Sequence, residues 1–424
     1  MRKALFILLF GFIPGGPALA DHPNEGTIPL EKLVEEALAQ NQEIRAFNLR
    51  MEAANKDVSA ARGAYFPEIS IEGGPLKTKF NDEGNSGTAA YGKAEWNLYR
   101  GGLDNAAIGI KALEAELSKK QFNLAKSRVE REVARLYYEM LFLFEGAALK
   151  EKALQMNQEQ MNLAKIKNRS GFTSSADVIE FELSEATIKS DLKRLVQEKA
   201  EKSRELSVLL GRSEPNSDLL VAGHLSKESL RTDGKKVLTN LERENQDLIE
   251  ADIERQIAEK EKSIARSGFL PRLNFESRYG KIANEERVFS GKNNYSIFLR
   301  LNIPLFSGLS TKNDVGAAGA RLVQKEAVYT QKALTARAEA DNLVSQIDSI
   351  LERLALEEKT LRRSEDYYKI TLAEYRRGVK NSPDMVGAAE RLLDAKIRNL
   401  EYRRDHHLAI LKLRGLAGLG LQAN

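Results

Sequence analysis

The segment GAYFPEISIE, from Gly63 to Glu72, marks an abrupt change in the character of this chain. A polar run rich in Ala and Lys precedes it, and alternating apolar and polar residues begin after Pro67. A similar segment, GFLPRLNFES, spans Gly268 to Ser277. Because proline interrupts helices and alternation is typical of strands, each segment predicts a switch from helix to strand.

The two segments belong to a longer internal repeat. Pro67 matches Pro271 at an offset of 204 residues, and later landmarks match at an offset of 207. These landmarks are Tyr99-Arg100-Gly101 with Phe306-Ser307-Gly308, Gly171 with Gly378, Asp177 with Asp384, and Leu209 with Leu416. Constant spacing over so long a stretch indicates a tandem duplication.

The duplication divides the chain into four parts. We expect a signal peptide at 1–20, a first repeat at 21–211, a linker at 212–235 and a second repeat at 236–424. Each repeat is predicted to contain a helix, two strands and a long helical hairpin. The strands are expected at about 67–77 and 91–100, and at about 271–281 and 294–306.

Two stretches without proline predict unusually long helices. No proline occurs in 76–214 or in 305–382, and proline inside a helix costs roughly 3 kcal/mol. The run from Leu103 to Asn168 would be roughly 100 Å long as a helix, and Thr311 to Arg377 is similar. Apolar residues of the first run recur at alternating spacings of 4 and 3, typical of a coiled coil: Val129, Val133, Leu136, Met140, Leu143 and Ala147. We expect the helices to pack side by side in an extended bundle.

The N-terminus predicts export. Residues 1–20 combine a basic start, a short apolar stretch from Ala4 to Ile13, and Ala18-Leu19-Ala20 as a cleavage site. The alternative is a short N-terminal anchor. The chain has no cysteine, which excludes disulfides and lipid attachment at an N-terminal Cys. The formal charge of +4 would fall to about +2 after removal of a signal peptide that carries Arg2 and Lys3, which is too weak to indicate a nucleic-acid partner.

The predicted strands have two different faces. In Tyr295–Ile303, apolar residues at odd positions oppose Ser296, Arg300 and Asn302. Ala94, Trp96 and Leu98 oppose Lys93, Glu95 and Asn97 in the same way. This pattern fits a membrane barrel around a wet lumen, and equally a half-buried hairpin packed on helices. Because four strands cannot close a barrel, the membrane reading requires two, three or four copies.

These features together resemble the TolC family of outer-membrane channels over essentially the whole exported chain. The resemblance rests on the duplicated plan, the strands after Pro67 and Pro271, the NLYRGG and PLFSG strand exits, and the paired turns near Gly171 and Gly378. It implies a mainly α fold with a small β part and very long coiled-coil helices. Three subunits of four strands each would form one transmembrane β-barrel, continued by a periplasmic α-barrel.

The resemblance also implies a function and partners. The protein would be the exit duct of a tripartite efflux pump or type I secretion system in a Gram-negative outer membrane, conducting substrates passively. Its partners would be two further copies in a homotrimer, a periplasmic adaptor protein, an inner-membrane transporter and outer-membrane lipid. The alternative is a periplasmic coiled-coil adaptor or structural protein outside the membrane. The substrate class is not encoded in any motif.

Site residues follow from the same resemblance. The turns at Gly171 and Gly378 would bind the adaptor, with Ser174 and Ser382 as helix N-caps. Asp384 would point into a periplasmic constriction, and Asp177, Tyr375 and Lys380 would belong to the network that holds it closed. Gly387 stands where some relatives carry a second acid. Alternatively, both Asp residues only complement helix dipoles.

No pattern for catalysis or for a cofactor is present. His406 and His407 are adjacent, so a helix points them about 100° apart, and we expect them on a polar surface. The segment GLAGLG, from Gly415 to Gly420, follows a predicted helix instead of a strand and predicts a helix end. We therefore expect neither an enzyme nor a metal site.

Overall fold

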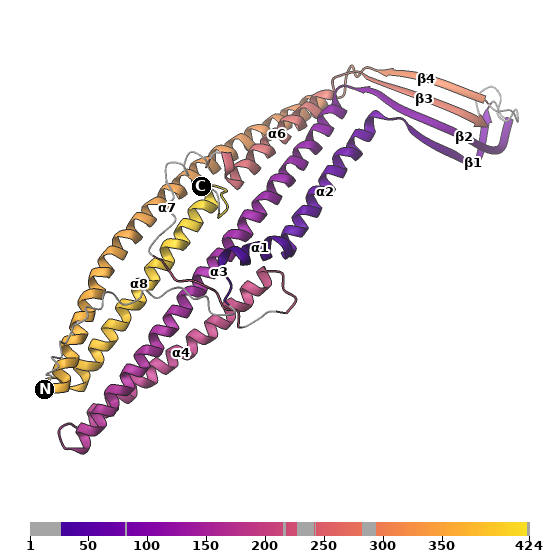
Figure 1. The fold of residues 1–424 in the computed structure, drawn as a ribbon. Coiled ribbons are helices and arrows are strands. Elements are labelled where there is room, and N and C mark those ends of the chain that lie inside the picture. Colours follow the sequence, from indigo (N-terminus) through magenta and orange to yellow (C-terminus); the bar gives the residue numbers. More distant parts are fainter. Residues whose placement is uncertain are drawn as a thin grey trace, which may run out of the picture.

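The fold is described from a computed structural model over residues 27–80, 83–214, 218–226, 241, 243–281 and 294–421. The predicted signal peptide, part of the linker and the second strand loop lie outside these residues. A long bundle of helices ends in a sheet that bends away from the bundle axis (Figure 1).

The sheet has four antiparallel strands in the order β1-β2-β3-β4. These are β1 (Glu68–Phe80), β2 (Glu83–Arg100), β3 (Arg272–Lys281) and β4 (Asn294–Asn302). Each repeat contributes one hairpin, and pairs such as Lys93 with Arg278 join the two hairpins. The outer edges of β1 and β4 have no partner strand within the described part of the chain.

The strand limits differ from the predicted ones. β2 begins at Glu83 instead of about 91, and the ladder to β1 continues to the pair Phe80 and Glu83. Backbone hydrogen bonds sustain this extension through a Gly-rich sequence that has little strand propensity of its own. β4 ends at Asn302, ahead of the predicted 306, because Pro304 has no N–H to donate to a ladder.

Two helices dominate the bundle and confirm the long runs expected from the absence of proline. α3 (Leu103–Arg169) has 67 residues and α7 (Ser310–Arg377) has 68, so each is about 100 Å long. α4 (Ser175–Leu209) returns along α3, and α8 (Ser382–Leu416) returns along α7. At the sheet end, α2 (Gln42–Arg62) pairs with α3 and α6 (Gln246–Ser267) with α7.

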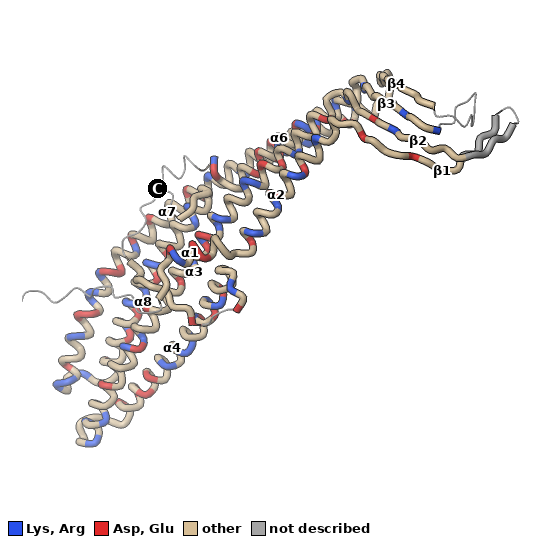
Figure 2. The backbone as a smooth tube through the Cα atoms, turned by 45° about the vertical axis from the view of Figure 1, so that its right-hand side comes forward, with Lys and Arg blue, Asp and Glu red and all other residues tan. Residues whose placement is uncertain are grey.

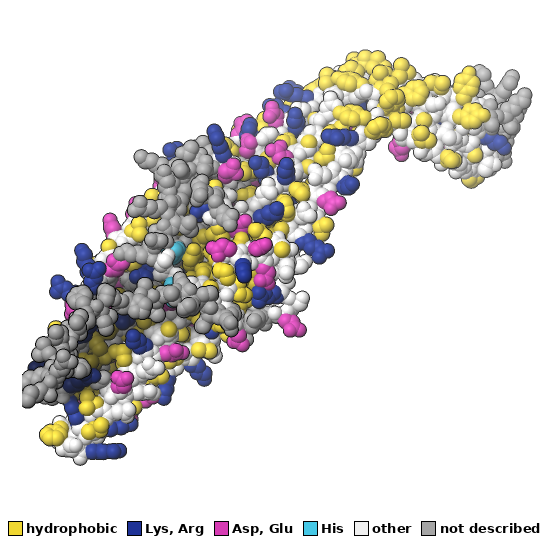
Figure 3. Space-filling view, in the orientation of Figure 1, with side chains coloured by type: hydrophobic (Ala, Val, Ile, Leu, Met, Phe, Trp, Pro, Cys, Tyr) yellow, Lys and Arg dark blue, Asp and Glu magenta, His cyan; other side chains and the backbone are white. Residues whose placement is uncertain are grey.

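The helix surfaces are strongly charged. Basic and acidic residues are interspersed along the whole bundle (Figure 2), whereas hydrophobic side chains gather where the sheet meets the helices (Figure 3). Among the described helices, none combines the length and the apolar character that crossing a membrane would require.

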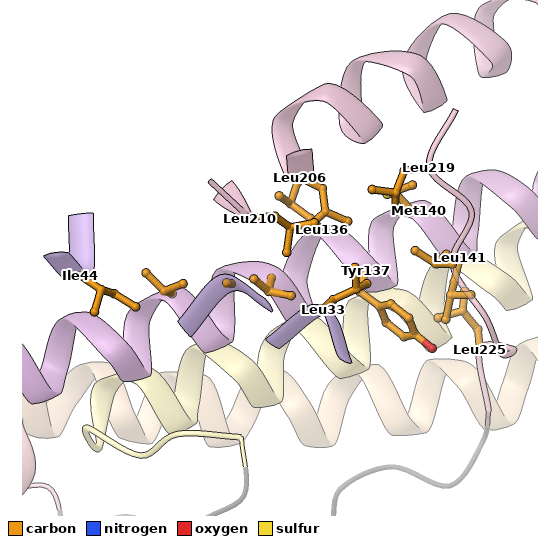
Figure 4. Close-up of a cluster of buried hydrophobic side chains, with 14 of the residues drawn as sticks. Leu33, Ile44, Leu136, Tyr137, Met140, Leu141, Leu206, Leu210, Leu219 and Leu225 are labelled. Carbon is orange, nitrogen blue, oxygen red and sulfur yellow. The ribbon is translucent and has the colours of Figure 1, made fainter. Parts of the chain in front are cut away.

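The main core lies near the middle of the bundle, where α1 (Leu30–Gln40) and the segment 218–226 cross α3 (Figure 4). The predicted coiled-coil seam of α3 is buried there, including Leu136 and Met140. Leu33 from α1 and Leu206 from α4 pack against it. Burial of such side chains contributes about 1.5–3 kcal/mol each, so this cluster stabilises the packing of α1, α4 and the segment 218–226 on α3.

The prediction that His406 and His407 form a polar surface was wrong. Both are at least 95% buried, and the His407 ring stacks on Tyr138 with 4.3 Å between ring centroids. Burial lowers the pKa of both imidazoles. This part of α8 packs on α3 and on the segment 218–226, a set of contacts between distant segments that helical periodicity does not reveal.

Candidate functional site

The first helical turn at the far end of the bundle joins α3 to α4. Gly171 adopts a positive φ of 74°, and the Phe172 N–H donates to the Lys167 carbonyl at 2.9 Å. These bonds close the C-terminus of α3. Ser174 is the N-cap of α4 as predicted, and forms a capping box with Asp177, whose Oδ2 accepts from the Ser174 N–H at 3.1 Å.

The second turn joins α7 to α8 in the same way. Gly378 has φ of 81°, and the Val379 N–H donates to the Glu374 carbonyl at 3.0 Å. The predicted N-cap Ser382 is wrong, because the last residue with extended backbone is Asn381. Its Oδ1 accepts from the Asp384 N–H at 3.1 Å, which leaves Ser382 as the first residue of the helix.

Asp177 connects the two turns. The Ser382 N–H donates to its Oδ1 at 3.2 Å, and the Thr173 hydroxyl donates to its Oδ2. Partial burial by itself raises the pKa of Asp177. The hydrogen bonds from Thr173 and from the Ser382 and Ser174 N–H groups outweigh that effect and lower the pKa to about 2. The carboxylate therefore holds α4 and α8 together at their N-termini.

Tyr375 is buried beside this connection, with 3% of its surface exposed. Its ring meets Phe181 of α4 edge to face at 6.0 Å between centroids. Lys167 of α3 places Nζ 4.3 Å above the ring and donates to the Tyr375 carbonyl at 2.6 Å. Burial raises the pKa of the Tyr375 hydroxyl. Tyr375 thus fastens the end of α7 to both helices of the first repeat.

Asp384 and Lys380 have a different environment. Their side chains are more than a third exposed, and Lys380 Nζ lies 3.7 Å from Asp384 Oδ2. Among the described residues, no hydrogen bond or ion pair joins Asp384 to Asp177 or Tyr375. A Cβ at Gly387 would meet open space, and the glycine itself supplies no second carboxylate beside Asp384. The fold therefore brings Asp177 and Tyr375 into one connected cluster and leaves Asp384 and Lys380 at the surface.

Sequence reasoning missed three members of this cluster: Lys167, Phe181 and Thr173. Thr173 carried a usable signal, because a hydroxyl next to a capping box is well placed to reach its acid. Lys167 and Phe181 carried none, since they are single residues in long helical runs and their roles depend on contacts with α7.

The sheet forms the second candidate site, and one of its faces is ionic. Lys93 lies between Glu95 and Glu72, with Nζ–Oε1 distances of 2.6 and 3.3 Å, and Arg278 reaches Glu276 at 2.5 Å. The register places three carboxylates side by side across the strands, and the next row carries two bases: Glu68, Glu95 and Glu276, then Lys93 and Arg278. Neighbouring rows of opposite charge offset the repulsion within each row.

The opposite face of the sheet is apolar and uncovered. Its large side chains are more than half exposed at Ile69, Ile71, Tyr279, Tyr295, Ile297, Leu299 and Leu301. The helices pack end-on to the sheet and cover neither face (Figure 1). The sequence pattern also allowed a half-buried hairpin packed on helices. The described part of the structure does not have that packing, because the apolar face of the sheet is exposed.

The described residues hold no cluster of three or more His, Asp or Glu side chains arranged to bind a metal ion. The two sites are thus a polar helical tip and a two-faced sheet, separated by helices about 100 Å long.

Comparisons with known proteins agree with this arrangement. The family model described as outer membrane efflux protein matches residues 33–212 and 237–419. The probable efflux pump outer membrane protein TtgC of Pseudomonas putida is 24% identical over 381 residues, covering 87% of this chain and 78% of that protein. The outer membrane protein TolC of Vibrio cholerae is 22% identical over 409 residues, covering 92% and 90%.

The crystal structure of the outer membrane protein VceC from Vibrio cholerae has the same fold. It matches with a TM-score of 0.81 at 18% identity, over 93% of this chain and 97% of that one. The chain belongs to the outer membrane efflux protein family, the TolC family of channels, and is an outer-membrane exit duct for efflux that extends into the periplasm.

Proposed function

We propose that three copies of this chain assemble into one continuous duct. The observation that supports this most strongly is the sheet, which has one ionic face, one exposed apolar face and, among the described residues, two unpaired edges. Unpaired strand edges are not tolerated in hydrocarbon, where each free N–H and C=O costs several kcal/mol. Pairing β4 of one copy with β1 of the next satisfies both edges.

Three copies contribute twelve strands, an even number that suits a closed antiparallel barrel. The apolar face would then contact lipid, and the face carrying Lys93, Glu95 and Glu276 would line a wet lumen. The helices would continue the duct for about 100 Å into the periplasm, with the turns at Gly171 and Gly378 at its far end.

The partners in this proposal bind at the far end. A periplasmic adaptor protein would dock on the turns at Gly171 and Gly378, and an inner-membrane transporter would supply the energy for transport. Relatives described as efflux pump components support this role for the present chain.

Threefold symmetry would bring the exposed Asp384 of each copy around one axis, as the periplasmic constriction. Each Asp384 is paired only with Lys380 of its own chain, at 3.7 Å and near the surface, so its charge is available to the lumen. Like charges gathered on an axis attract cations. Asp177, Tyr375 and the turn contacts would hold the helix ends that present this ring.

Single-channel recording tests the duct directly. The purified protein is inserted into planar lipid bilayers, and discrete conductance steps are expected from the assembled trimer. Mass measurement of the same detergent-extracted sample should give three chains per particle. A monomer released with the periplasmic fraction, and no conductance, would instead favour a coiled-coil protein that stays outside the membrane.

A further inference from the structure

The exit from the second hairpin contains a strained residue. Among the described residues, Leu309 is the only non-glycine with positive φ, at 68°. Such a conformation is unfavourable for a residue with a Cβ. The equivalent position of the first repeat is Gly102, with φ of 81°, where the conformation has no such penalty. The second repeat therefore keeps a leucine where a glycine would remove the strain.

Within the described residues, the backbone at Leu309 is held by local hydrogen bonds, such as that from the Asn313 N–H to the Leu309 carbonyl at 3.0 Å, and its side chain is not buried. The Leu309 side chain is 58% exposed, and Leu305 and Phe306 beside it are 93% and 82% exposed. The equivalent exit from the first hairpin is stabilised within one protomer, where Arg100 Nε donates to Asp104 Oδ2 at 3.0 Å. The Leu309 side chain is therefore open to a contact from outside the protomer.

The patch formed by Leu305, Phe306 and Leu309, here the exit patch, continues the apolar face of the sheet. Leu301 and Ile303 precede it and are also more than half exposed. No charged residue occurs from 301 to 311, and the hydroxyls of Ser307 and Ser310 form local hydrogen bonds. Figure 3 shows hydrophobic side chains gathered at this junction between sheet and helices.

We propose that the exit patch is a membrane anchor, which inserts among the acyl chains of the periplasmic leaflet of the outer membrane. The left-handed backbone at Leu309 sets the direction of its Cα–Cβ bond, and burial of three large apolar side chains in lipid compensates the strain. The anchor fixes the depth at which the sheet gives way to the helices. This inference rests on the proposed placement of the sheet in the membrane.

Fluorescence quenching by brominated lipid tests the anchor, because the chain has a single tryptophan, Trp96, on the apolar face of the sheet. Full-length protein with Trp96→Phe receives one new tryptophan at Leu305, Phe306 or Leu309. Each variant is reconstituted in phosphatidylcholine vesicles with bromine on the acyl chains. We expect quenching of several fold at each patch position, comparable to that of Trp96 in the unmodified chain.

Phe172→Trp in the same background is the matched control. Phe172 is 84% exposed but lies in the turn at the far end of the bundle, so iodide in the buffer should quench it and brominated lipid should not. Leu305→Trp needs no left-handed backbone, and it keeps the test valid if Leu309→Trp fails to fold.

The outcomes separate this inference from the proposed function. Quenching of Trp96 by lipid without quenching at the exit patch overturns the anchor but leaves the sheet in the membrane. Absence of quenching at both places contradicts the membrane sheet itself. Protection of the patch from both lipid and iodide would show that a neighbouring copy covers it, which also overturns the anchor.

Discussion

Asp177 and Asp384 occupy equivalent positions in the two repeats but have different environments. Both follow a glycine turn by six residues and lie in the first turn of a returning helix. Asp177 accepts hydrogen bonds from Thr173, Ser174 and Ser382, whereas Asp384 only approaches Lys380 at the surface. After duplication, one acid became part of the framework of the tip, and the other remained exposed beside Lys380.

The same asymmetry holds for the residue three positions before each turn glycine. Tyr375 is buried against Phe181 and Lys167, while its equivalent Asn168 is half-buried and donates only to the Thr173 carbonyl at 2.9 Å. Tyr375→Ala is expected to lower the free energy of unfolding by about 3–5 kcal/mol, because it removes a large buried side chain. Asn168→Ala should cost about 1 kcal/mol.

Thermal unfolding followed by circular dichroism measures both variants, with Tyr375→Phe as the conservative control. The buried packing role of Tyr375 predicts a small effect for Phe and a large one for Ala. Equal effects of Tyr375→Ala and Asn168→Ala would contradict the assignment of Tyr375 as the residue that joins the repeats.

Asp177→Ala should have the next largest effect. It leaves the Ser382 N–H, in a residue only 1% exposed, without its acceptor, which costs about 1–3 kcal/mol. It also removes the capping box. Asp384→Ala at the equivalent position should change the melting temperature much less, because an exposed ion pair contributes about 0–1 kcal/mol. A reversed order in melting experiments would invalidate the comparison.

Acid titration should distinguish the two acids as well. The pKa of Asp177 lies at about 2 in the folded protein, below its ordinary value of 3.8. Its contribution is therefore complete above about pH 4 and is lost as the pH falls toward 2. The melting-temperature difference between wild type and Asp177→Asn should shrink across this range. A difference that stays constant from pH 5 to about 2 would show that the charge of Asp177 adds no stability.

Asp384→Asn should change ion selectivity with little effect on stability. If three Asp384 side chains surround the axis, neutralising them should reduce the preference of the channel for cations, seen as a shift of the reversal potential in a salt gradient. Glu198→Gln, on the α4 surface away from the tip, is a charge-matched control. An unchanged reversal potential for Asp384→Asn would show that the constriction lies elsewhere.

The sequence predicted those features that depend on local patterns. Pro67 and Pro271, the alternation in Tyr295–Ile303 and the proline-free runs each express a rule of neighbouring residues, and the corresponding elements are present. The duplication was visible for the same reason, because its landmarks recur at a fixed offset.

The remaining features depend on contacts between distant segments. The bond from Ser382 to Asp177 spans 205 residues, and the burial of His407 depends on Tyr138 of another helix. The N-cap was assigned to Ser382 instead of Asn381 because both side chains can cap, and only the backbone conformation separates them. Sequence patterns identified the two turns but not the network that connects them.

Cross-linking of the sheet edges tests the central claim, the barrel shared by three chains, most directly. The chain has no cysteine, so Ile71→Cys on β1 and Ile297→Cys on β4 introduce the only thiols. A short bis-maleimide applied to isolated outer membranes should then produce dimers and trimers and no larger species, whereas either single variant should remain monomeric. Only monomers from the double variant, or a ladder that extends beyond three chains, would contradict the account.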